Sequence, residues 1–162
     1  MSARCQIAAQ VHPNLAAFLD MIAWAEGTDN GRQRTMDRGY DVVVGGDNFT
    51  GYADHPRILV SLPALKIKST AAGRYQLLSR YWDAYRNSLG LPDFGPLSQD
   101  KVAIQQIKER RAIQQIERGD FEGAVRSVKN IWASMPGAGY SQHEQHILKL
   151  AAAYEAAGGV IA

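Results

Sequence analysis

The chain has 162 residues, of which 46% are hydrophobic and 21% are charged, and its formal net charge is +2. This length and composition are typical of one globular domain that buries a sizeable core. A single cysteine, Cys5, excludes an intramolecular disulfide, and no apolar run is long enough for a signal peptide or a membrane anchor. We therefore expect a monomer that is made and kept in the cytosol and does not insert into membranes.

The first periodic segment of the chain predicts an amphipathic helix over residues 14–25. Asn14 is a candidate N-cap, and Gly27 is a plausible C-terminal stop. Residues 1–13 show no such pattern and are expected to form a frayed tail. The single domain is therefore expected to span 14–162.

The next segment changes from helical spacing to alternation. Residues 40–52 alternate around the turn residues 45–48, which predicts a small β-hairpin. The irregular stretch 53–68 contains two prolines and is predicted to be a long loop.

The remainder of the chain predicts helices. One should follow Ser69–Thr70 and end near Ser88, and another should cover residues 98–118. Asp120 should cap a shorter helix, and Ser141 with Glu144 forms a capping box for the last one. A helix, a small sheet and a helical remainder make an α+β plan, in which a groove between the sheet lobe and the helical lobe is expected.

Glu26 lies at the end of the first predicted helix. It follows Leu15 by eleven residues, close to three helical turns, so it continues the apolar stripe of that helix. Partial burial and the negative end of the helix dipole would both raise its pKa. A raised carboxyl pKa is what a general acid needs near neutral pH. From periodicity alone, an exposed glutamate in the last turn is the alternative.

Several ordered motifs closely resemble the endolysins of lambda-like phages. The likeness spans nearly the whole chain, from about Asn14 to Gly159. The motifs that carry it are Ala23–Gln33, Gly39–Gly46, Asp54–Arg57, Ala72–Leu78, Gln105–Arg110 and Asn130–Tyr140. The resemblance implies a lysozyme-like fold with a small sheet lobe, a larger helical lobe and a substrate groove between them.

The resemblance further implies lytic transglycosylase activity on the glycan strand of peptidoglycan, with Glu26 as the catalytic acid. Because a sugar hydroxyl then attacks within the same residue, a second carboxylate is unnecessary. Hydrolysing phage lysozymes resemble this fold but carry an aspartate nine residues after the glutamate, where this chain has Thr35. A hydrolytic muramidase is the alternative, with Asp29, Asp37 and Asp41 nearby, although turn or hairpin roles are favoured for these three.

Five side chains are candidates for binding the substrate. The segment that ends at Gln76 resembles the glycine-x-x-glutamine segment of many transglycosylases, which implies a sugar hydrogen bond from Gln76 and ring packing by Tyr75. Thr70 could contact the glycan or cap the following helix. His55 and Tyr140 lie on two segments expected to form the lips of the groove.

Two other classes remain as alternatives. A zinc amidase has little support, because His143 and His146 are three residues apart whereas the zincin motif places its histidines four apart. No metal or cofactor is therefore expected. A wall-binding module without activity is the second alternative, but such modules tend to be short or repeated.

The chain offers little support for a nucleic-acid partner. The basic residues Lys108, Arg110 and Arg111 are balanced by Glu109 and Glu117, which is typical of a solvated helix. The resemblance implies a different dependence: the enzyme waits in the host cytoplasm until a separate holin opens the membrane and gives it access to the wall.

Overall fold

The computed structural model describes residues 3–132, 134–135 and 146–162. Its elements in chain order are η1 (Ala8–Gln10), α1 (Pro13–Glu26), β1 (Val60–Leu62), η2 (Pro63–Leu65), β2 (Ile67–Ser69), α2 (Ser79–Leu89), α3 (Pro96–Glu109), α4 (Ile113–Glu117), α5 (Phe121–Val128) and α6 (Ile147–Ala156). Within this part of the chain, no helix is both long enough and apolar enough to cross a membrane.

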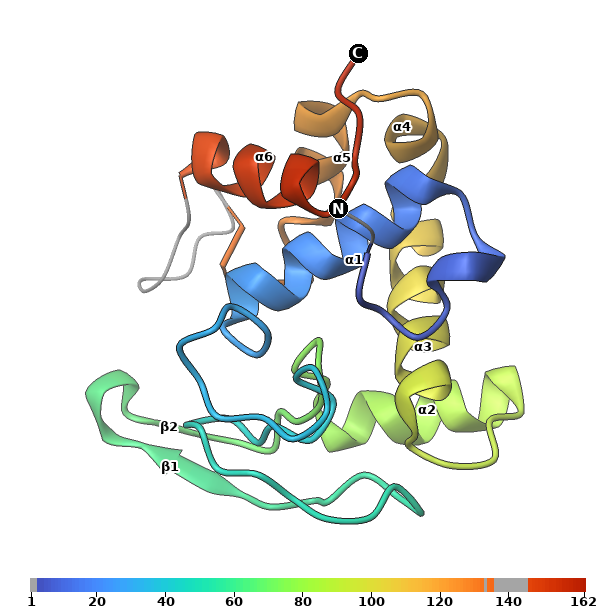
Figure 1. Ribbon diagram of the computed structural model, residues 1–162. Coiled ribbons are helices and arrows are strands. Elements are labelled where there is room, and N and C mark those ends of the chain that lie inside the picture. The colour runs from blue at the N-terminus through green and yellow to red at the C-terminus, as the bar shows by residue number, and fades with distance from the viewer. Residues whose placement is uncertain (1–2, 133, 136–145) are drawn as a thin grey trace.

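Helix α1 lies in the middle of the helical lobe, with α3, α4, α5 and α6 around it (Figure 1). Eleven of its fourteen residues are buried. Phe18 packs edge-on against Phe121 of α5 and Tyr154 of α6. The helix spans one residue more at each end than the predicted range. Pro13 occupies its first turn and the side chain of His12 caps it, so the prediction of Asn14 as the N-cap is wrong.

The buried apolar residues form two clusters. The larger one surrounds α1, and the smaller one lies in the lobe that carries the sheet, around Phe49, Trp82 and Phe94. Helix α3 belongs to both, since Val102 packs in the smaller cluster and Ile107 in the larger. One helix therefore fixes the two lobes to each other.

The sheet lies in a different place from the predicted hairpin. Over residues 40–52 the backbone forms only isolated bridges, one of them between this segment and the chain near Ala72. The glycine pair at 45–46 makes the predicted turn, with φ of 90° and 110°. The two-stranded sheet consists of β1 and β2, antiparallel with Val60 opposite Ser69, inside the predicted loop. The predicted hairpin is therefore reduced to one antiparallel bridge, between Val42 and Asn48, and the sheet lies later in the chain than predicted.

Helix α2 begins at Ser79, well after the predicted start at Ser69–Thr70. Between them, Ala72 and Leu77 exchange two backbone hydrogen bonds of 3.1 and 2.9 Å and close a compact turn, here called the 72–77 turn. Gly73 lies in the left-handed region within it, with φ of 85°. A helix cannot contain this geometry, so the prediction of a helix through the segment is wrong.

The single helix predicted over residues 98–118 is divided into α3 and α4. Arg111 adopts a left-handed φ of 58°, and its N–H donates to the carbonyl of Lys108 at 2.9 Å. This change of direction lets α4 pack against α1.

The structure tests the predicted cap of α5 but not that of α6. The carboxylate of Asp120 accepts the N–H of Gly123 at 3.1 Å, which confirms its predicted capping of α5. The predicted capping box of Ser141 and Glu144 lies outside the described residues. Helix α6 begins at Ile147.

Residues 3–13 pack against the domain, and the prediction of a frayed tail is wrong for them. The N–H of Cys5 donates to the carboxylate of Asp20 at 3.0 Å, and the N–H of Ile7 donates to Asp100 at 2.8 Å. The side chains of Cys5 and Ile7 are buried in the cluster around α1. Two carboxylates inside the domain thus hold this segment in place.

Candidate active site

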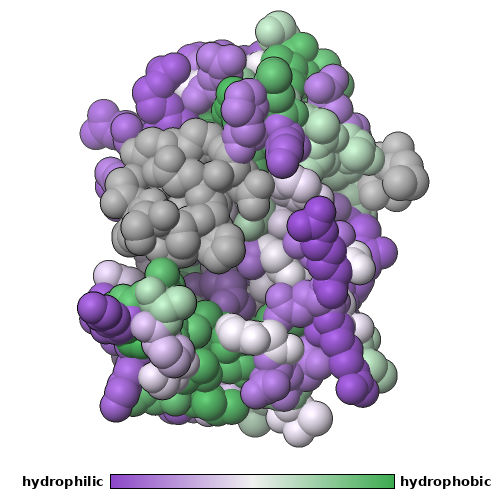
Figure 2. Space-filling view, turned by 90° about the vertical axis from the view of Figure 1, so that its left-hand side faces the viewer, coloured by the Kyte–Doolittle hydropathy of each residue, from purple (hydrophilic) through white to green (hydrophobic). Residues whose placement is uncertain are grey.

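Glu26 is the last residue of α1, and its position follows from the way this helix ends. Gly27 adopts a left-handed φ of 80°, and its N–H donates back to α1, which confirms the predicted C-terminal stop. This end of α1 reaches the side of the molecule that carries β1 and β2 (Figure 1). Seen face-on, that side is hollowed between its upper and lower parts (Figure 2).

The carboxyl of Glu26 is enclosed, although the residue as a whole is only half-buried. Burial raises its pKa to about 7, and a hydrogen bond of 3.3 Å from Ser134 Oγ to its Oε1 acts in the opposite direction. At neutral pH the protonated and ionised forms are therefore both populated. Such a group can donate a proton to a leaving oxygen and accept one in return. The alternative of an ordinary exposed glutamate does not hold.

Ser134 is the polar residue near Glu26 that sequence reasoning missed. Its side chain is buried, 108 positions away from Glu26 in the sequence. It lies within the motif Asn130–Tyr140, but nothing in the chemistry of that motif distinguishes this serine from a surface serine. Only the fold brings the two side chains together.

The three aspartates considered as a second carboxylate are all held by donors of this chain. The pairs are Asp29 with Arg4 and Arg74, Asp37 with Tyr52, and Asp41 with Thr35 and the N–H of Met36. Burial alone would raise the pKa of Asp29, but its hydrogen bonds from the two arginines lower it. These partners agree with the structural roles expected for the three carboxylates.

Gln76 and Tyr75 lie on the 72–77 turn. Gln76 has a left-handed φ of 54°, and its Nε2 donates to the carbonyl of Gly73 at 2.9 Å, while the residue stays half-buried. Tyr75 is buried, and its hydroxyl donates to the carboxylate of Asp100 at 2.6 Å. The structure therefore does not support the predicted packing of Tyr75 against a sugar ring.

Thr70 and His55 have structural partners. Thr70 Oγ1 accepts the N–H of Ser79, the first residue of α2, at 3.0 Å, although Leu78 is the N-cap of that helix, so Thr70 does not cap a helix that directly follows it as predicted. His55 is buried, and its Nε2–H donates to the carbonyl of Leu77 at 2.8 Å, while Nδ1 accepts a backbone N–H. The predicted sugar contact of His55 is not supported. Tyr140 lies outside the described residues.

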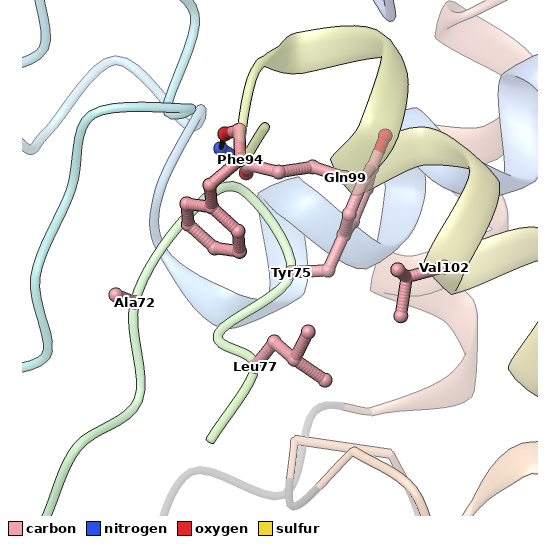
Figure 3. Close-up of a pocket in the computed structure, with 6 residues that line it drawn as sticks. All are labelled: Ala72, Tyr75, Leu77, Phe94, Gln99 and Val102. Carbon is pink, nitrogen blue, oxygen red and sulfur yellow. Dashed lines mark hydrogen bonds between the residues drawn. The ribbon is translucent and has the colours of Figure 1, made fainter. Parts of the chain in front are cut away.

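Two cavities border the 72–77 turn. One has a volume of about 290 Å³ and a mainly polar lining that includes Gln76, Tyr81 and Trp132, from the turn, α2 and the segment that leads to Ser134. The other has a volume of only about 10 Å³. Its six lining side chains converge from the turn, α3 and the segment before α3 (Figure 3). That space is sufficient for about one water molecule, so it cannot hold a sugar.

A metal site is absent from the part of the chain that the structure describes, where no group of three histidine, cysteine or acidic side chains could hold an ion. His143 of the zinc alternative lies outside those residues. His146 lies within them, and its Nδ1 accepts the N–H of Leu148 at the start of α6.

Comparison with known proteins identifies the family. The family model described as endolysin matches residues 16–161. The chain belongs to the endolysin family. This endolysin is 60% identical over 152 residues to the endolysin of Escherichia phage lambda, covering 94% of this chain and 96% of that protein. It is 50% identical over 159 residues to the endolysin of Escherichia phage P2, covering 92% and 95%.

Solved structures confirm the predicted lysozyme-like fold. The chain is similar to bacteriophage lambda lysozyme complexed with a chitohexasaccharide, with a TM-score of 0.91 and 59% identity over 94% of this chain and 99% of that one. A second structure of lysozyme from bacteriophage lambda gives 0.88 and 57% over the same shares. As an endolysin, the protein is an enzyme that degrades the bacterial cell wall.

Proposed function

We propose that this endolysin is a lytic transglycosylase that cleaves the β-1,4 bond between N-acetylmuramic acid and N-acetylglucosamine, with Glu26 as its acid and base. The observation that carries the proposal is the enclosed carboxyl of Glu26, whose pKa burial raises to about 7. A carboxyl with this pKa holds a proton often enough to donate it and is basic enough, once ionised, to accept another.

The reaction needs a proton donor, a nucleophile and a proton acceptor. Glu26 gives its proton to the glycosidic oxygen as the bond from that oxygen to C1 of the muramic residue breaks, so the glucosamine leaves with a free hydroxyl. The C6 hydroxyl of the same muramic residue attacks C1, and its proton passes to the Glu26 carboxylate. A 1,6-anhydro ring forms, Glu26 ends in its starting state, and no water is consumed.

Hydrolysis of the same bond is the alternative. Glycosidases that use water employ a second carboxylate as nucleophile or base. Asp29, Asp37 and Asp41 are each engaged by donors of this chain, which favours a nucleophile within the sugar. The high effective concentration of an intramolecular hydroxyl removes the need for an activated water.

A glycan substrate is supported by the similarity to the lambda lysozyme structure, which contains a chitohexasaccharide. The side of the molecule that carries β1 and β2 is hollowed (Figure 2), and we place the glycan strand there. The polar cavity beside the 72–77 turn includes Tyr81, which is 46% exposed and can lie against a sugar ring.

Mass spectrometry of purified peptidoglycan after digestion tests the reaction type. Transglycosylation predicts muramic ends in the 1,6-anhydro form, lighter by one water than reducing ends. Reducing ends as the main product would refute transglycosylation and support hydrolysis.

Replacement of Glu26 tests the residue. Glu26→Gln should lower the rate of strand cleavage by about 10³-fold while glycan binding persists, because the amide can neither donate nor accept the proton. Glu117→Gln, at an exposed glutamate of α4, is the matched control and should cleave at the wild-type rate. Wall lysis by folded Glu26→Gln at the wild-type rate would exclude the mechanism.

A further inference from the structure

Two consecutive backbone carbonyls of the 72–77 turn accept hydrogen bonds from both sides of the candidate active site. The carbonyl of Arg74 accepts Thr28 Oγ1–H at 2.6 Å, and the carbonyl of Tyr75 accepts Trp132 Nε1–H at 3.1 Å. Thr28 follows Glu26 by two residues, and Trp132 precedes Ser134 by two. Both donors are buried, with 1% and 3% of their surface exposed.

The acceptor segment is itself held firmly. The side chain of Arg74 is fully buried, and its guanidinium donates to the carboxylates of Asp20 and Asp29 at 3.0 and 3.1 Å. The N–H of Arg74 donates to Gln99 Oε1 at 2.9 Å. Buried charges paired in this way resist displacement, because any movement leaves one of them without a partner.

From this arrangement we infer that Trp132 and Thr28 are positioning residues of the endolysin reaction: through the Arg74 and Tyr75 carbonyls they hold the Ser134 hydroxyl against the Glu26 carboxyl. The inference rests on the proposed role of Glu26. Trp132 fixes the segment that carries the hydroxyl, and Thr28 fixes the end of the helix that carries the carboxyl.

The contact between Ser134 and Glu26 matters most in the second half of the proposed reaction. Once Glu26 has given up its proton, it is an anion in an enclosed site, where an unpartnered charge is costly. A hydroxyl donor stabilises this anion and limits the rise of the pKa that burial causes. Fixing the donor before the reaction avoids ordering it at each turnover.

Other ionisable groups near this end of α1 do not take the place of Ser134. Asp20 on α1 and Asp29 after it are both bonded to Arg74 on the 72–77 turn. Within the described residues, burial and the Ser134 hydrogen bond are the two influences on the pKa of Glu26. The pH at which activity falls on the alkaline side should therefore depend on the hydrogen bond from Ser134.

A double-mutant cycle on Trp132 and Ser134 tests the inference. The measured quantity is the pH at which kcat/KM on purified glycan strands falls to half on the alkaline side. Ser134→Ala removes a donor to the carboxylate and should raise this pH by about half to one unit. Trp132→Phe keeps the aromatic ring but loses the N–H, and it should shift this pH in the same direction. The double variant should shift it no further than Ser134→Ala alone.

Trp82→Phe is the matched control. Trp82 is fully buried in the smaller cluster, and its Nε1–H donates to the carboxylate of Asp54 at 2.9 Å, so this variant also loses an indole hydrogen bond, but away from Glu26. It should leave the pH of half-maximal kcat/KM at the wild-type value. The positioning role of Trp132 would be refuted if Trp132→Phe left the pH of half-maximal kcat/KM unchanged. It would also be refuted if the shifts of Trp132→Phe and Ser134→Ala added fully in the double variant.

Thr28 is tested by a pair of substitutions. Thr28→Val keeps the shape but removes the hydroxyl and should lower kcat several-fold with little change in KM, whereas Thr28→Ser keeps the hydroxyl and should restore most of the rate. Equal kcat values for the two variants would refute the role of Thr28. If Glu26→Gln stays active, the proposed function fails. If Glu26→Gln is inactive but Thr28→Val and Thr28→Ser have equal kcat values, only the positioning inference fails.

Discussion

The protonation of Glu26 is coupled to folding as well as to the proposed chemistry. Its pKa is about 7 in the folded protein, against an ordinary value of 4.5 for an unfolded chain, so the folded state binds the proton more tightly. The stabilisation that this provides is fully present below pH 4.5 and is lost as the pH rises through about 7. The carboxyl that suits the reaction therefore weakens the fold at alkaline pH.

Replacing the Glu26 carboxyl should show how much it lowers the stability of the fold at alkaline pH. Glu26→Gln should raise the free energy of unfolding at pH 8 by about 1 to 3 kcal/mol, and it should have little effect at pH 4, because a neutral amide never ionises in the enclosed site. Urea unfolding of both proteins at the two pH values measures the difference. Glu117→Gln should change stability by the same small amount at each pH. A gain from Glu26→Gln that is equal at pH 4 and pH 8 would contradict the coupling.

Single residues differ in how far the sequence predicts them. The spacing of Glu26 from Leu15 leaves a buried and an exposed carboxyl as alternatives, and the pKa raised by burial agrees with the buried one. Ser134 could not be found in this way, because its contact with Glu26 joins segments 108 positions apart. The sequence predicts substrate contacts for Tyr75 and His55, yet their polar atoms bond inside the domain.

At the scale of elements, local pattern identifies helices better than it identifies strands. The helical spacing of α1 and the cap of α5 are local features, and both are present, although α1 is buried nearly all round and not on one stripe as predicted. The short strands β1 and β2 pair over three residues each, flank Pro63, and give no clear alternation. Over residues 40–52 the structure shows little of the predicted alternation, because residues 40–43 are all buried and the backbone forms only isolated bridges.

The 72–77 turn depends on a glycine for two separate reasons. Gly73 has a φ of 85°, and a Cβ on it would overlap Gln99 Oε1 and come within 3.1 Å of the Phe94 ring. Gln99 cannot move aside freely, because the same oxygen accepts the N–H of Arg74. Gly51 has a similar φ of 82° but nothing within 4 Å of its Cβ position.

Alanine substitutions at Gly51 and Gly73 separate the effect of backbone strain on stability from the effect of steric crowding. Gly51→Ala should lower the free energy of unfolding by about 1 to 2 kcal/mol, the cost of a left-handed residue with a Cβ. Gly73→Ala should lower it by about 1 to 3 kcal/mol more, because it also overfills the space beside Gln99. Urea unfolding of both variants gives the comparison. Equal losses would show that the turn yields to the added methyl group.

At the scale of the whole molecule, the segment 3–13 extends the structure beyond the family match, which begins at residue 16. Its backbone N–H groups bond to Asp20 and Asp100, and these carboxylates also bind Arg74 and Tyr75. The segment thus joins the buried polar network behind the 72–77 turn. The sequence gives no sign of this, because the contacts are made by the backbone.

Deletion of residues 1–7 should therefore destabilise the protein. The loss of buried Ile7 and of the hydrogen bonds to two carboxylates should lower the free energy of unfolding by about 3 kcal/mol or more. Thermal unfolding should show a correspondingly lower Tm. Gln10→Ala, at an exposed residue of the same segment, should leave the Tm at the wild-type value. An unchanged Tm after the deletion would mean that the segment adds nothing to the fold.

Cys5, the single thiol of the chain, gives this segment a built-in reporter. Burial raises its pKa to about 12, and its side chain is enclosed by the cluster around α1, so an alkylating reagent should react only after the segment detaches. The rate of alkylation in native buffer would then time that detachment, independently of unfolding of the helical lobe. Asp20→Asn, which weakens the acceptor for the Cys5 N–H and also the ion pair with Arg74, should accelerate alkylation at a given pH. One cysteine thus makes the opening of the N-terminus measurable without any engineered probe.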